Sequence, residues 1–337
     1  MSTEQRSHIW YRSQKWKRML VRDAEESAMQ DEPFVDPDIA TGAPPLGRYY
    51  EVDGRRLLLH RSGSGGPAVV FLPGGGSVGL DYWNVQERAA EFTTSVVYDR
   101  TGTGWSDRVD APPTCAEVVD ELHRLLRTAD VPAPYLLVGH SLGGLHARLY
   151  ATRFPGEVAG LVLMDPDHED YDGYMPRQLA EMRDAWDPDQ ELPDELPEEA
   201  VRLYRDLFAQ MMEDWPERIR ESLIECHVSA EWIMDGYELV PYRGRFLDEL
   251  RHAGPLPDVP LIVLTAMDID DFKKAVLIGE SESLLREEID GKRRLHDALA
   301  ASVPRGENRL VEGAGHASIH WRRPDAVLRA VQDLLGR

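Results

Sequence analysis

One serine stands between an apolar run and a helix start. Residues 135–138 form a short, unbroken apolar run, which predicts a buried strand. The sequence GHSLG follows directly at residues 139–143, and the pattern over 144–150 predicts the opening of a helix. This order predicts a sharp turn that holds the Ser141 hydroxyl above the edge of a sheet, because glycine lets two backbone segments cross closely. The alternative is an ordinary Gly-rich turn of another α/β protein.

Strand and helix patterns alternate on both sides of this turn. Asp53-Gly54 lies between the apolar segments 49–52 and 56–60 and predicts a hairpin. Further strands are predicted over 68–72, 95–98, 160–164, 261–264 and 308–312, and helices over 116–129 (capped by Thr114) and 321–335 (with Pro324 in its first turn). This alternation predicts an α/β fold with a mostly parallel, doubly wound sheet covered by helices on both faces.

The alternation breaks down between Asp165 and Pro260. That interval holds helical patterns over 200–212 and 217–235 and an acidic, Pro-rich stretch over 187–199 that predicts an exposed loop. We therefore expect three regions: an N-terminal helical arm (1–47), a core (48–166 and 259–337) and a helical cap inserted over 167–258. The arm is compatible with packing on the body, a contact in a homodimer or a partly disordered tail, and a membrane-surface helix is a weaker alternative.

Charge and composition exclude several classes of protein. The chain of 337 residues carries a net charge of −22, of which −16 falls between Asp167 and Asp258. A surface this acidic argues against nucleic-acid binding through phosphates. No apolar run approaches the length of a membrane span, and the N-terminus has no secretory h-region. Two cysteines, Cys115 and Cys226, make no disulfide framework, so we expect a reduced, cytoplasmic setting.

The residues that carry chemistry start with Ser141 and a histidine. A serine hydroxyl is a poor nucleophile until a base takes its proton. His316 closes the glycine-flanked sequence GAGH (313–316) after the last predicted strand, where a loop can present the imidazole to Ser141. His320 lies four residues on, but a two-histidine metal site lacks further ligands and the H-E-x-x-H arrangement. We therefore expect no metal and no cofactor.

Backbone donors for an oxyanion are expected in two places. The sequence LPGGGS (72–77) follows the first buried strand, and its glycines allow N–H groups to approach a developing negative charge. We expect one donor to be Leu142 and the other Gly75, or Gly76 if the register differs by one. No Lys-Ser/Thr follows, which excludes a P-loop. In the segment 98–106, Asp99 and Arg100 are expected to brace loops near the site.

The acid that orients the histidine is left open by the sequence. Asp165 ends the predicted strand 160–164, whereas Asp268, Asp270 and Asp271 follow the strand 261–264. Either location can face the histidine in a parallel sheet, since the carboxyl ends of the strands share one edge. We prefer Asp165 because it is cleanly placed at its strand end, with Asp268 or Asp270 as the alternative.

In these motifs the chain resembles the α/β-hydrolases. The segments 72–76, 98–106, 139–144 and 313–316 stand in the order of that family, and the resemblance covers about 48–166 and 259–337. Pro73 departs from it, because a histidine commonly precedes the oxyanion glycines. A serine at position 141 argues against the dehalogenase and epoxide hydrolase branches, whose nucleophile is usually aspartate.

The resemblance implies a serine hydrolase. It would cleave a carboxylic ester, thioester or lactone of a small molecule through an acyl-enzyme. One alternative is an acyltransferase that uses the same Ser141–His316 pair, and a second is a catalytically silent member that binds a small molecule. A peptidase is a weaker enzyme alternative. The four readings differ in whether Ser141 reacts, in the bond that it attacks and in what accepts the acyl group.

Overall fold

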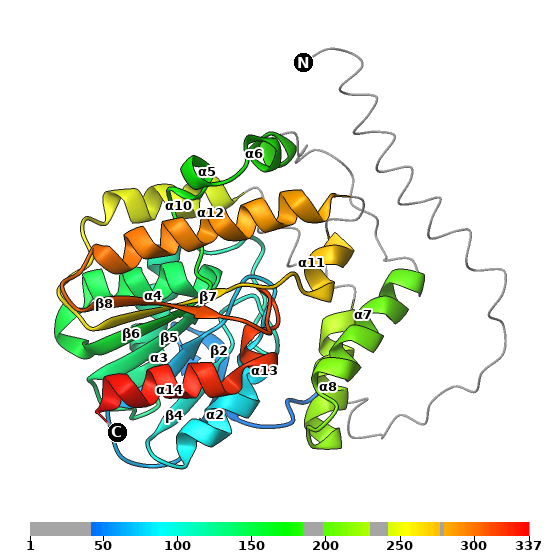
Figure 1. Ribbon diagram of the computed structural model, residues 1–337. Helices are drawn as coiled ribbons and strands as arrows, with labels where there is room; N and C mark the ends of the chain where they lie inside the picture. The colour runs from blue at the N-terminus through cyan, green and yellow to red at the C-terminus, as the bar shows by residue number, and fades with distance from the viewer. Residues whose placement is uncertain (1–41, 185–197, 230–241, 277–279, 337) are drawn as a thin grey trace.

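A single sheet organises the computed structural model, which describes residues 42–184, 198–229, 242–276 and 280–336. Within these residues the sheet has eight strands in the order β1-β2-β4-β3-β5-β6-β7-β8 (Figure 1). The strands are β1 (Arg48–Val52), β2 (Arg55–Ser62), β3 (Ala68–Leu72), β4 (Ser95–Tyr98), β5 (Tyr135–His140), β6 (Val158–Met164), β7 (Leu261–Ala266) and β8 (Gly306–Val311). The pairs that involve β2 are antiparallel and all others are parallel, which confirms the predicted mostly parallel sheet.

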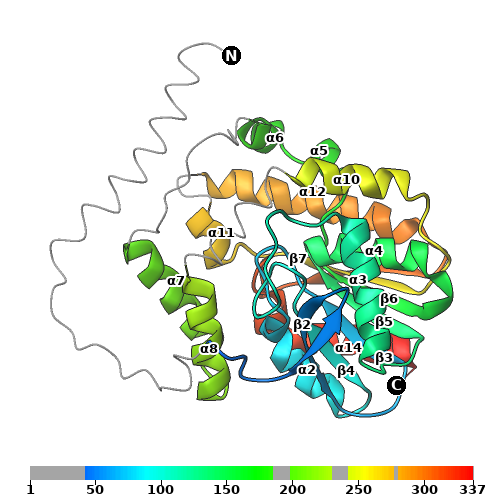
Figure 2. The same cartoon turned by 180° about the vertical axis from the view of Figure 1, so that it is seen from behind.

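Both faces of the sheet are covered, as the unbroken apolar runs predict. One face carries α3 (Cys115–Thr128), α4 (Leu142–Arg153), α10 (Arg243–His252) and α12 (Glu282–Ala301), and the other carries α2 (Trp83–Ala90) and α14 (Pro324–Leu335) (Figures 1 and 2). Along β3, Val70 packs into the cluster on the first face and Phe71 into the cluster on the second, and both are fully buried. The alternation follows from the two-residue period of a strand.

Turn and capping residues in the sequence mark several ends of the helices and strands. The hairpin between β1 and β2 turns at Asp53 (φ 51°) and Gly54 (φ 77°), and this pair of positive φ angles is typical of a tight two-residue turn. Thr114 caps α3, and its side chain accepts a hydrogen bond from the Glu117 N–H. The predicted helix over 321–335 is instead two helices, α13 (Ile319–Arg322) and α14. They separate at Arg323, because the residue before a proline is driven out of the helical region.

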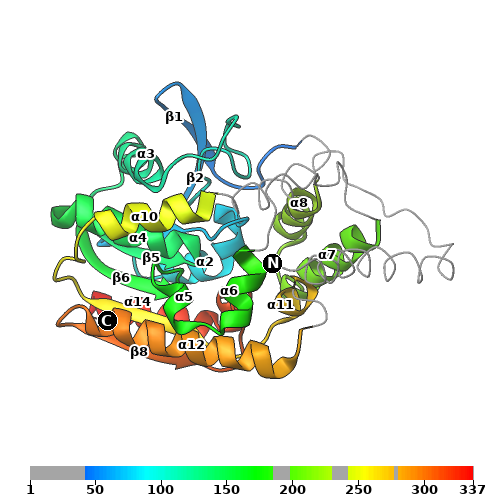
Figure 3. The same ribbon diagram turned by 90° about the horizontal axis from the view of Figure 1, so that it is seen from above.

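Helices α5 (Tyr171–Tyr174), α6 (Arg177–Asp184), α7 (Glu198–Met211), α8 (Glu217–Val228) and α10 lie between β6 and β7. Helices α7 and α8 gather with α11 (Asp271–Val276) at one end of the molecule (Figure 3). The helix predicted over 217–235 ends at Val228, and the helix α7 begins inside the stretch predicted as the loop 187–199. The rest of that loop and most of the predicted arm over 1–47 lie outside the described residues. In the part of the chain that the structure describes, no helix is both long and apolar enough to span a bilayer.

Candidate active site

Ser141 occupies a strained turn between β5 and α4. Its backbone has φ 50° and ψ −118°, a region that a residue with a side chain seldom adopts. The serine is tied to its surroundings on both sides, since its N–H donates to Met164 O and its own carbonyl accepts from the N–H groups of Gly144 and Asp167. This geometry is that of a nucleophile elbow.

The glycines around Ser141 make the turn possible. A Cβ at Gly143 would lie 2.1 Å from the carbonyl oxygen of Leu72, and a Cβ at Gly139 would lie 2.5 Å from the carbonyl oxygen of Gly143. At Gly144 the obstacle would be the Pro166 Cβ, 2.6 Å away. Each glycine therefore meets a close approach of helix α4 to the strand ends around it.

His316 lies beside Ser141 although 175 residues separate them in the chain. The imidazole Nε2 is 3.1 Å from Ser141 Oγ, and Nδ1 is 2.5 Å from Asp165 Oδ2. A carboxylate accepts hydrogen bonds only, so the Nδ1–H donates to Asp165 and leaves Nε2 free to accept the serine proton. The structure thus brings Ser141, His316 and Asp165 into one line of polar contacts, in the order that nucleophilic catalysis by serine requires.

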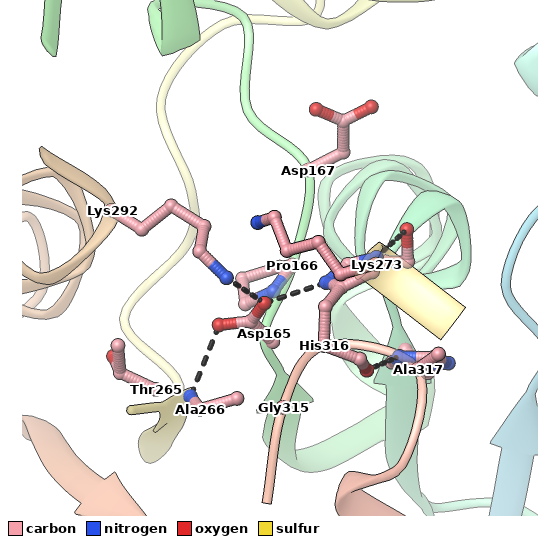
Figure 4. A network of polar contacts seen from close by, with 12 residues as sticks. Asp165, Pro166, Asp167, Thr265, Ala266, Lys273, Lys292, Gly315, His316 and Ala317 are labelled. Atoms are coloured by element: carbon pink, nitrogen blue, oxygen red, sulfur yellow. Dashed lines mark hydrogen bonds and ion pairs between the residues drawn. The ribbon is translucent and has the colours of Figure 1, made fainter. Parts of the chain in front are cut away.

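Asp165 is the most enclosed member of this line. Its side chain is fully buried, and its Oδ1 accepts a 3.1 Å hydrogen bond from the N–H of Ala266 at the end of β7. The other oxygen, Oδ2, contacts both His316 and the ammonium group of Lys292 (Figure 4). Burial by itself raises the pKa of this carboxyl, but Lys292 and His316 outweigh burial and hold the pKa well below its usual value. Asp165 is therefore ionised.

The two alternative acids, Asp268 and Asp270, accept hydrogen bonds from the backbone on either side of His316. Asp268 Oδ2 accepts a 2.5 Å hydrogen bond from the Gly313 N–H, and Asp270 Oδ2 accepts a 2.8 Å bond from the Ala317 N–H. Among the hydrogen bonds and ion pairs of the described residues, neither carboxylate is paired with the His316 ring. The preference for Asp165 as the partner of the imidazole thus agrees with the geometry.

Arg100 and Asp99 brace the loop that follows β3. The Arg100 guanidinium donates to the carbonyl oxygens of Pro73 and Gly74 at 2.6 and 2.9 Å. Asp99 accepts from the N–H of Gly79 at 2.7 Å, on the far side of the same loop. The Gly74 carbonyl shares its peptide plane with the Gly75 N–H, so anchoring this carbonyl fixes the direction of that N–H.

The expected oxyanion donors come from the loop after β3 and from the first residue of α4. Gly75 lies in an exposed turn, and Leu142 is the first residue of α4. Among the hydrogen bonds of the described residues, neither N–H has a protein acceptor, whereas the Gly74 N–H already donates to Tyr82 Oη at 3.1 Å. Gly76, the alternative donor, turns with φ 70°. The N–H groups of Gly75 and Leu142 are therefore available to a ligand.

His140 links the loop after β3 to the loop after β8 that carries His316. Tyr82 Oη donates to His140 Nδ1 at 2.7 Å, and His140 Nε2–H donates to the carbonyl oxygen of His316 at 2.8 Å. Burial, followed by the nearby His316, lowers the pKa of His140 to about 3, so this ring is neutral and serves as a fixed bridge.

His320 does not join His316 in a metal site. His316 lies in the loop before α13, and the buried His320 ring stacks on Tyr82 with 4.4 Å between ring centroids. Over the described ranges of the chain, no group of three or more metal-ligating side chains could hold an ion.

A cavity of about 410 Å³ opens beside Ser141 and His316. Its walls come from the strand ends and from helices α5, α6, α10, α11 and α12. They comprise Asp165, Pro166, Asp167, Tyr171, Leu179, Arg243, Asp270, Phe272, Lys273, Glu288, Lys292 and Ala317. The charged residues are largely paired with one another: Arg243 contacts Asp167 at 2.7 Å and Lys273 contacts Glu288 at 2.6 Å. The cavity thus combines a mostly apolar wall with charged groups that nearly balance one another, and it has the size of a small-molecule site.

Helix α12 supplies site residues that the sequence analysis did not anticipate. Glu288 and Lys292 stand one turn apart on it and both line the cavity. The signal for the helix was present in the apolar positions Leu284, Leu285, Ile289 and Leu295, which recur at helical spacing. Its two buried charges carried no motif that would assign them to a site.

Comparisons with known proteins agree with this architecture. The Bacillus subtilis protein YqjL is 37% identical over 123 residues, a match that covers 35% of this chain and 47% of YqjL. The chain thus spans less than half the length of that curated relative. A variant of the meta-cleavage product hydrolase CumD from Pseudomonas fluorescens superposes with a TM-score of 0.57 at 16% identity, over 87% of this chain and 98% of that one.

A second solved structure shares the fold to a similar degree. The enol-lactonase from Burkholderia xenovorans has a TM-score of 0.55 at 19% identity, over 86% of this chain and 100% of that one. Identities this low speak for the fold alone. The sequence model of the Alpha/beta hydrolase family matches residues 69–330, which is most of the chain. The protein therefore belongs to the alpha/beta hydrolase family.

Proposed function

We propose that the protein is a serine hydrolase that cleaves a carboxylic ester, thioester or lactone of a small molecule through an acyl-enzyme. The observation that carries this proposal is the continuous line from Ser141 Oγ through His316 to Asp165, with contacts of 3.1 and 2.5 Å. A fully buried, ionised carboxylate behind an imidazole is the arrangement that lets a serine act as nucleophile at neutral pH.

The first half of the reaction forms a covalent intermediate. Ser141 Oγ attacks the carbonyl carbon while His316 Nε2 takes the hydroxyl proton, and Asp165 stabilises the imidazolium that results. The N–H groups of Gly75 and Leu142 stabilise the negative charge on the carbonyl oxygen. When the tetrahedral intermediate collapses, His316 returns the proton to the leaving oxygen or sulfur and the acyl group stays on Ser141.

The second half releases the product. Water enters, His316 Nε2 takes one of its protons, and the resulting hydroxide equivalent attacks the acyl carbon. Collapse of the second tetrahedral intermediate frees the carboxylic acid and returns the proton to Ser141. No cofactor or metal takes part in either half.

The segment 167–258 supports the choice of a small substrate. Asp167, Tyr171, Leu179 and Arg243 come from this segment and form part of the cavity wall. We propose that the segment acts as a cap that determines which substrates enter. The volume of about 410 Å³ favours a compact substrate over a long acyl chain.

A fluorophosphonate probe tests the proposal without knowledge of the natural substrate. The wild-type protein should be labelled at Ser141, and it should hydrolyse members of a panel of short-chain aryl esters, thioesters and lactones. The variant Ser141→Ala should fold, resist labelling and lose at least about 10³-fold in kcat/KM. Absence of labelling and turnover in the wild type would instead favour a binding protein. Transfer of the acyl group to an added alcohol or amine in preference to water would favour the acyltransferase.

A further inference from the structure

Lys292 makes a contact that the Ser141–His316–Asp165 line does not require. It projects from α12 with a side chain that is 6% exposed and pairs with Asp165 Oδ2. That same oxygen accepts the His316 Nδ1–H at 2.5 Å. Figure 4 shows Lys292 and His316 approaching Asp165 from opposite sides. A cation therefore shares the one oxygen that faces the imidazole.

This arrangement has two physical consequences. The ammonium fixes the rotation of the carboxylate, with Ala266 N–H holding the second oxygen. It also opposes a positive charge on the imidazole, since two cations that share one anion repel each other strongly in a buried site. The first effect positions His316, and the second disfavours a further positive charge on the opposite side of Asp165.

The other charged groups around the Asp165–His316 pair do not neutralise the positive charge of Lys292. Glu288 lies one turn earlier on α12, but its carboxylate already pairs with Lys273 at 2.6 Å and accepts from Tyr171 Oη at 2.7 Å. The titratable and charged groups that face the pair from the surrounding elements are His140, Asp167, Tyr171, Arg243, Asp270, Lys273, Glu288, His296 and His320. Of these, His140 and His320 are neutral because burial lowers their pKa values, and the acidic groups have partners of their own.

We propose that Lys292 is a positioning residue of the active site, which fixes the carboxylate of Asp165 and places a positive charge opposite the His316 ring. The inference rests on the proposed function, because it concerns the base of that reaction. It also assigns the buried charge of α12 a role in the chemistry, beyond its contribution to packing.

The predicted effect of removing the charge has a definite sign. Without the ammonium, the Asp165–His316 pair holds its proton to higher pH, whichever of the two residues carries it. The acid limb of the pH–rate profile should therefore move upward by about one pH unit or more. A loss of structure alone would lower the rate at every pH and leave the limb where it is.

The test measures the rate of fluorophosphonate labelling of Ser141 against pH in three proteins. Lys292→Met should move the acid limb upward, and Lys292→Arg, which keeps the charge, should restore most of the wild-type limb. Arg293→Met is the matched control, because this neighbour on α12 also carries a cation but pairs with Asp297 at the surface. Its limb should coincide with that of the wild type.

The outcomes separate this inference from the proposed function. A wild-type protein that the probe does not label contradicts the proposed function. Normal labelling with the same acid limb in Lys292→Met and wild type overturns the role of Lys292. If Lys292→Met does not fold, Lys292→Gln provides the same test, because its amide can donate to Asp165 without carrying a charge.

Discussion

The carboxylate of Asp270 accepts a 2.8 Å hydrogen bond from the backbone N–H of Ala317, the residue directly after His316. The fit is tight on the other side of the histidine as well, since a Cβ at Gly315 would lie 2.6 Å from the same carboxylate oxygen. Asp270 thus positions the loop, whereas Asp165 contacts the imidazole itself. Two acidic residues from neighbouring strand ends therefore hold one histidine by different means.

This division predicts unequal losses for two matched substitutions. Asp165→Asn should lower kcat by about 10³- to 10⁴-fold. The neutral amide cannot stabilise the imidazolium, and its NH2 group can donate to Nδ1 and so favour the wrong tautomer of the imidazole. Asp270→Asn should cost about tenfold or less, since an amide oxygen can still accept from Ala317 N–H. Esterase kinetics on both purified variants would measure the difference. A larger loss for Asp270→Asn at unchanged KM would contradict the proposal that Asp165 is the acid that acts on His316.

The proximity of Ser141 and His316 could be predicted from sequence because the signals of both residues are local. A strand, a GHSLG turn and a helix are contiguous at Ser141, and His316 closes a glycine-flanked loop after the last strand. The acid could not be decided, because Asp165, Asp268 and Asp270 all follow neighbouring parallel strands. Which one meets the imidazole depends on a few ångströms of loop geometry, including the positive φ of 42° at Asp165.

The contact of Lys292 was beyond sequence reasoning for a different reason. The lysine and Asp165 are 127 residues apart, and a lysine in an amphipathic helix ordinarily faces solvent. Only the packing of α12 against β7 and β8 turns it inward. The helix break at Arg323, by contrast, has a local cause. Pro324 drives Arg323 out of the helical region, whereas the sequence analysis placed this proline inside the first turn of a single helix.

The close backbone packing around Ser141 predicts that one methyl group added at Gly143 strongly lowers stability. Gly143→Ala would bring a Cβ to 2.1 Å from Leu72 O and 2.7 Å from Pro73 O, both of them backbone atoms that cannot rotate away. We expect the free energy of unfolding to fall by about 3 kcal/mol or more. Gly156→Ala is the control, because a Cβ there meets nothing within 4 Å, and its effect should stay within about 0.5 kcal/mol. Urea unfolding of both variants measures the contrast, and equal stabilities would refute the close approach.

The contacts of Arg100 with the loop after β3 predict that even a conservative change at this residue lowers the catalytic rate. One guanidinium spans the carbonyl oxygens of Pro73 and Gly74, and a lysine offers no fork that reaches both. Arg100→Lys should lower kcat by about 10- to 100-fold with a smaller change in KM, since the Gly75 N–H loses its orientation in the transition state.

The control for Arg100 is an exposed arginine whose guanidinium contacts a carboxylate and not the loop after β3. Arg56→Lys removes the contacts of Arg56 with Asp107 at the surface and should leave both kinetic constants within about twofold. Steady-state kinetics with one ester substrate suffices for the comparison. An Arg100→Lys enzyme with full kcat would show that the loop is held without the guanidinium.

His140 predicts how stability responds to acid. Its pKa is lowered to about 3 in the folded protein, first by burial, whereas the unfolded chain takes up the proton near pH 6.5. Below pH 6.5 the unfolded state therefore binds a proton that the folded state refuses, and stability falls as the pH drops toward about 3. This one residue should account for a loss of up to about 4 kcal/mol across that window.

The variant His140→Asn isolates this contribution. At pH 7.5 it should be less stable than the wild type, because the bridge from Tyr82 to the His316 carbonyl is broken. The gap should narrow as the pH falls from 6.5 toward 4, since the variant has no buried ring to keep neutral. Urea unfolding of the variant and the wild type at several pH values measures this difference in stability, and a difference that stays constant with pH would show that the His140 ring does not remain neutral in the fold.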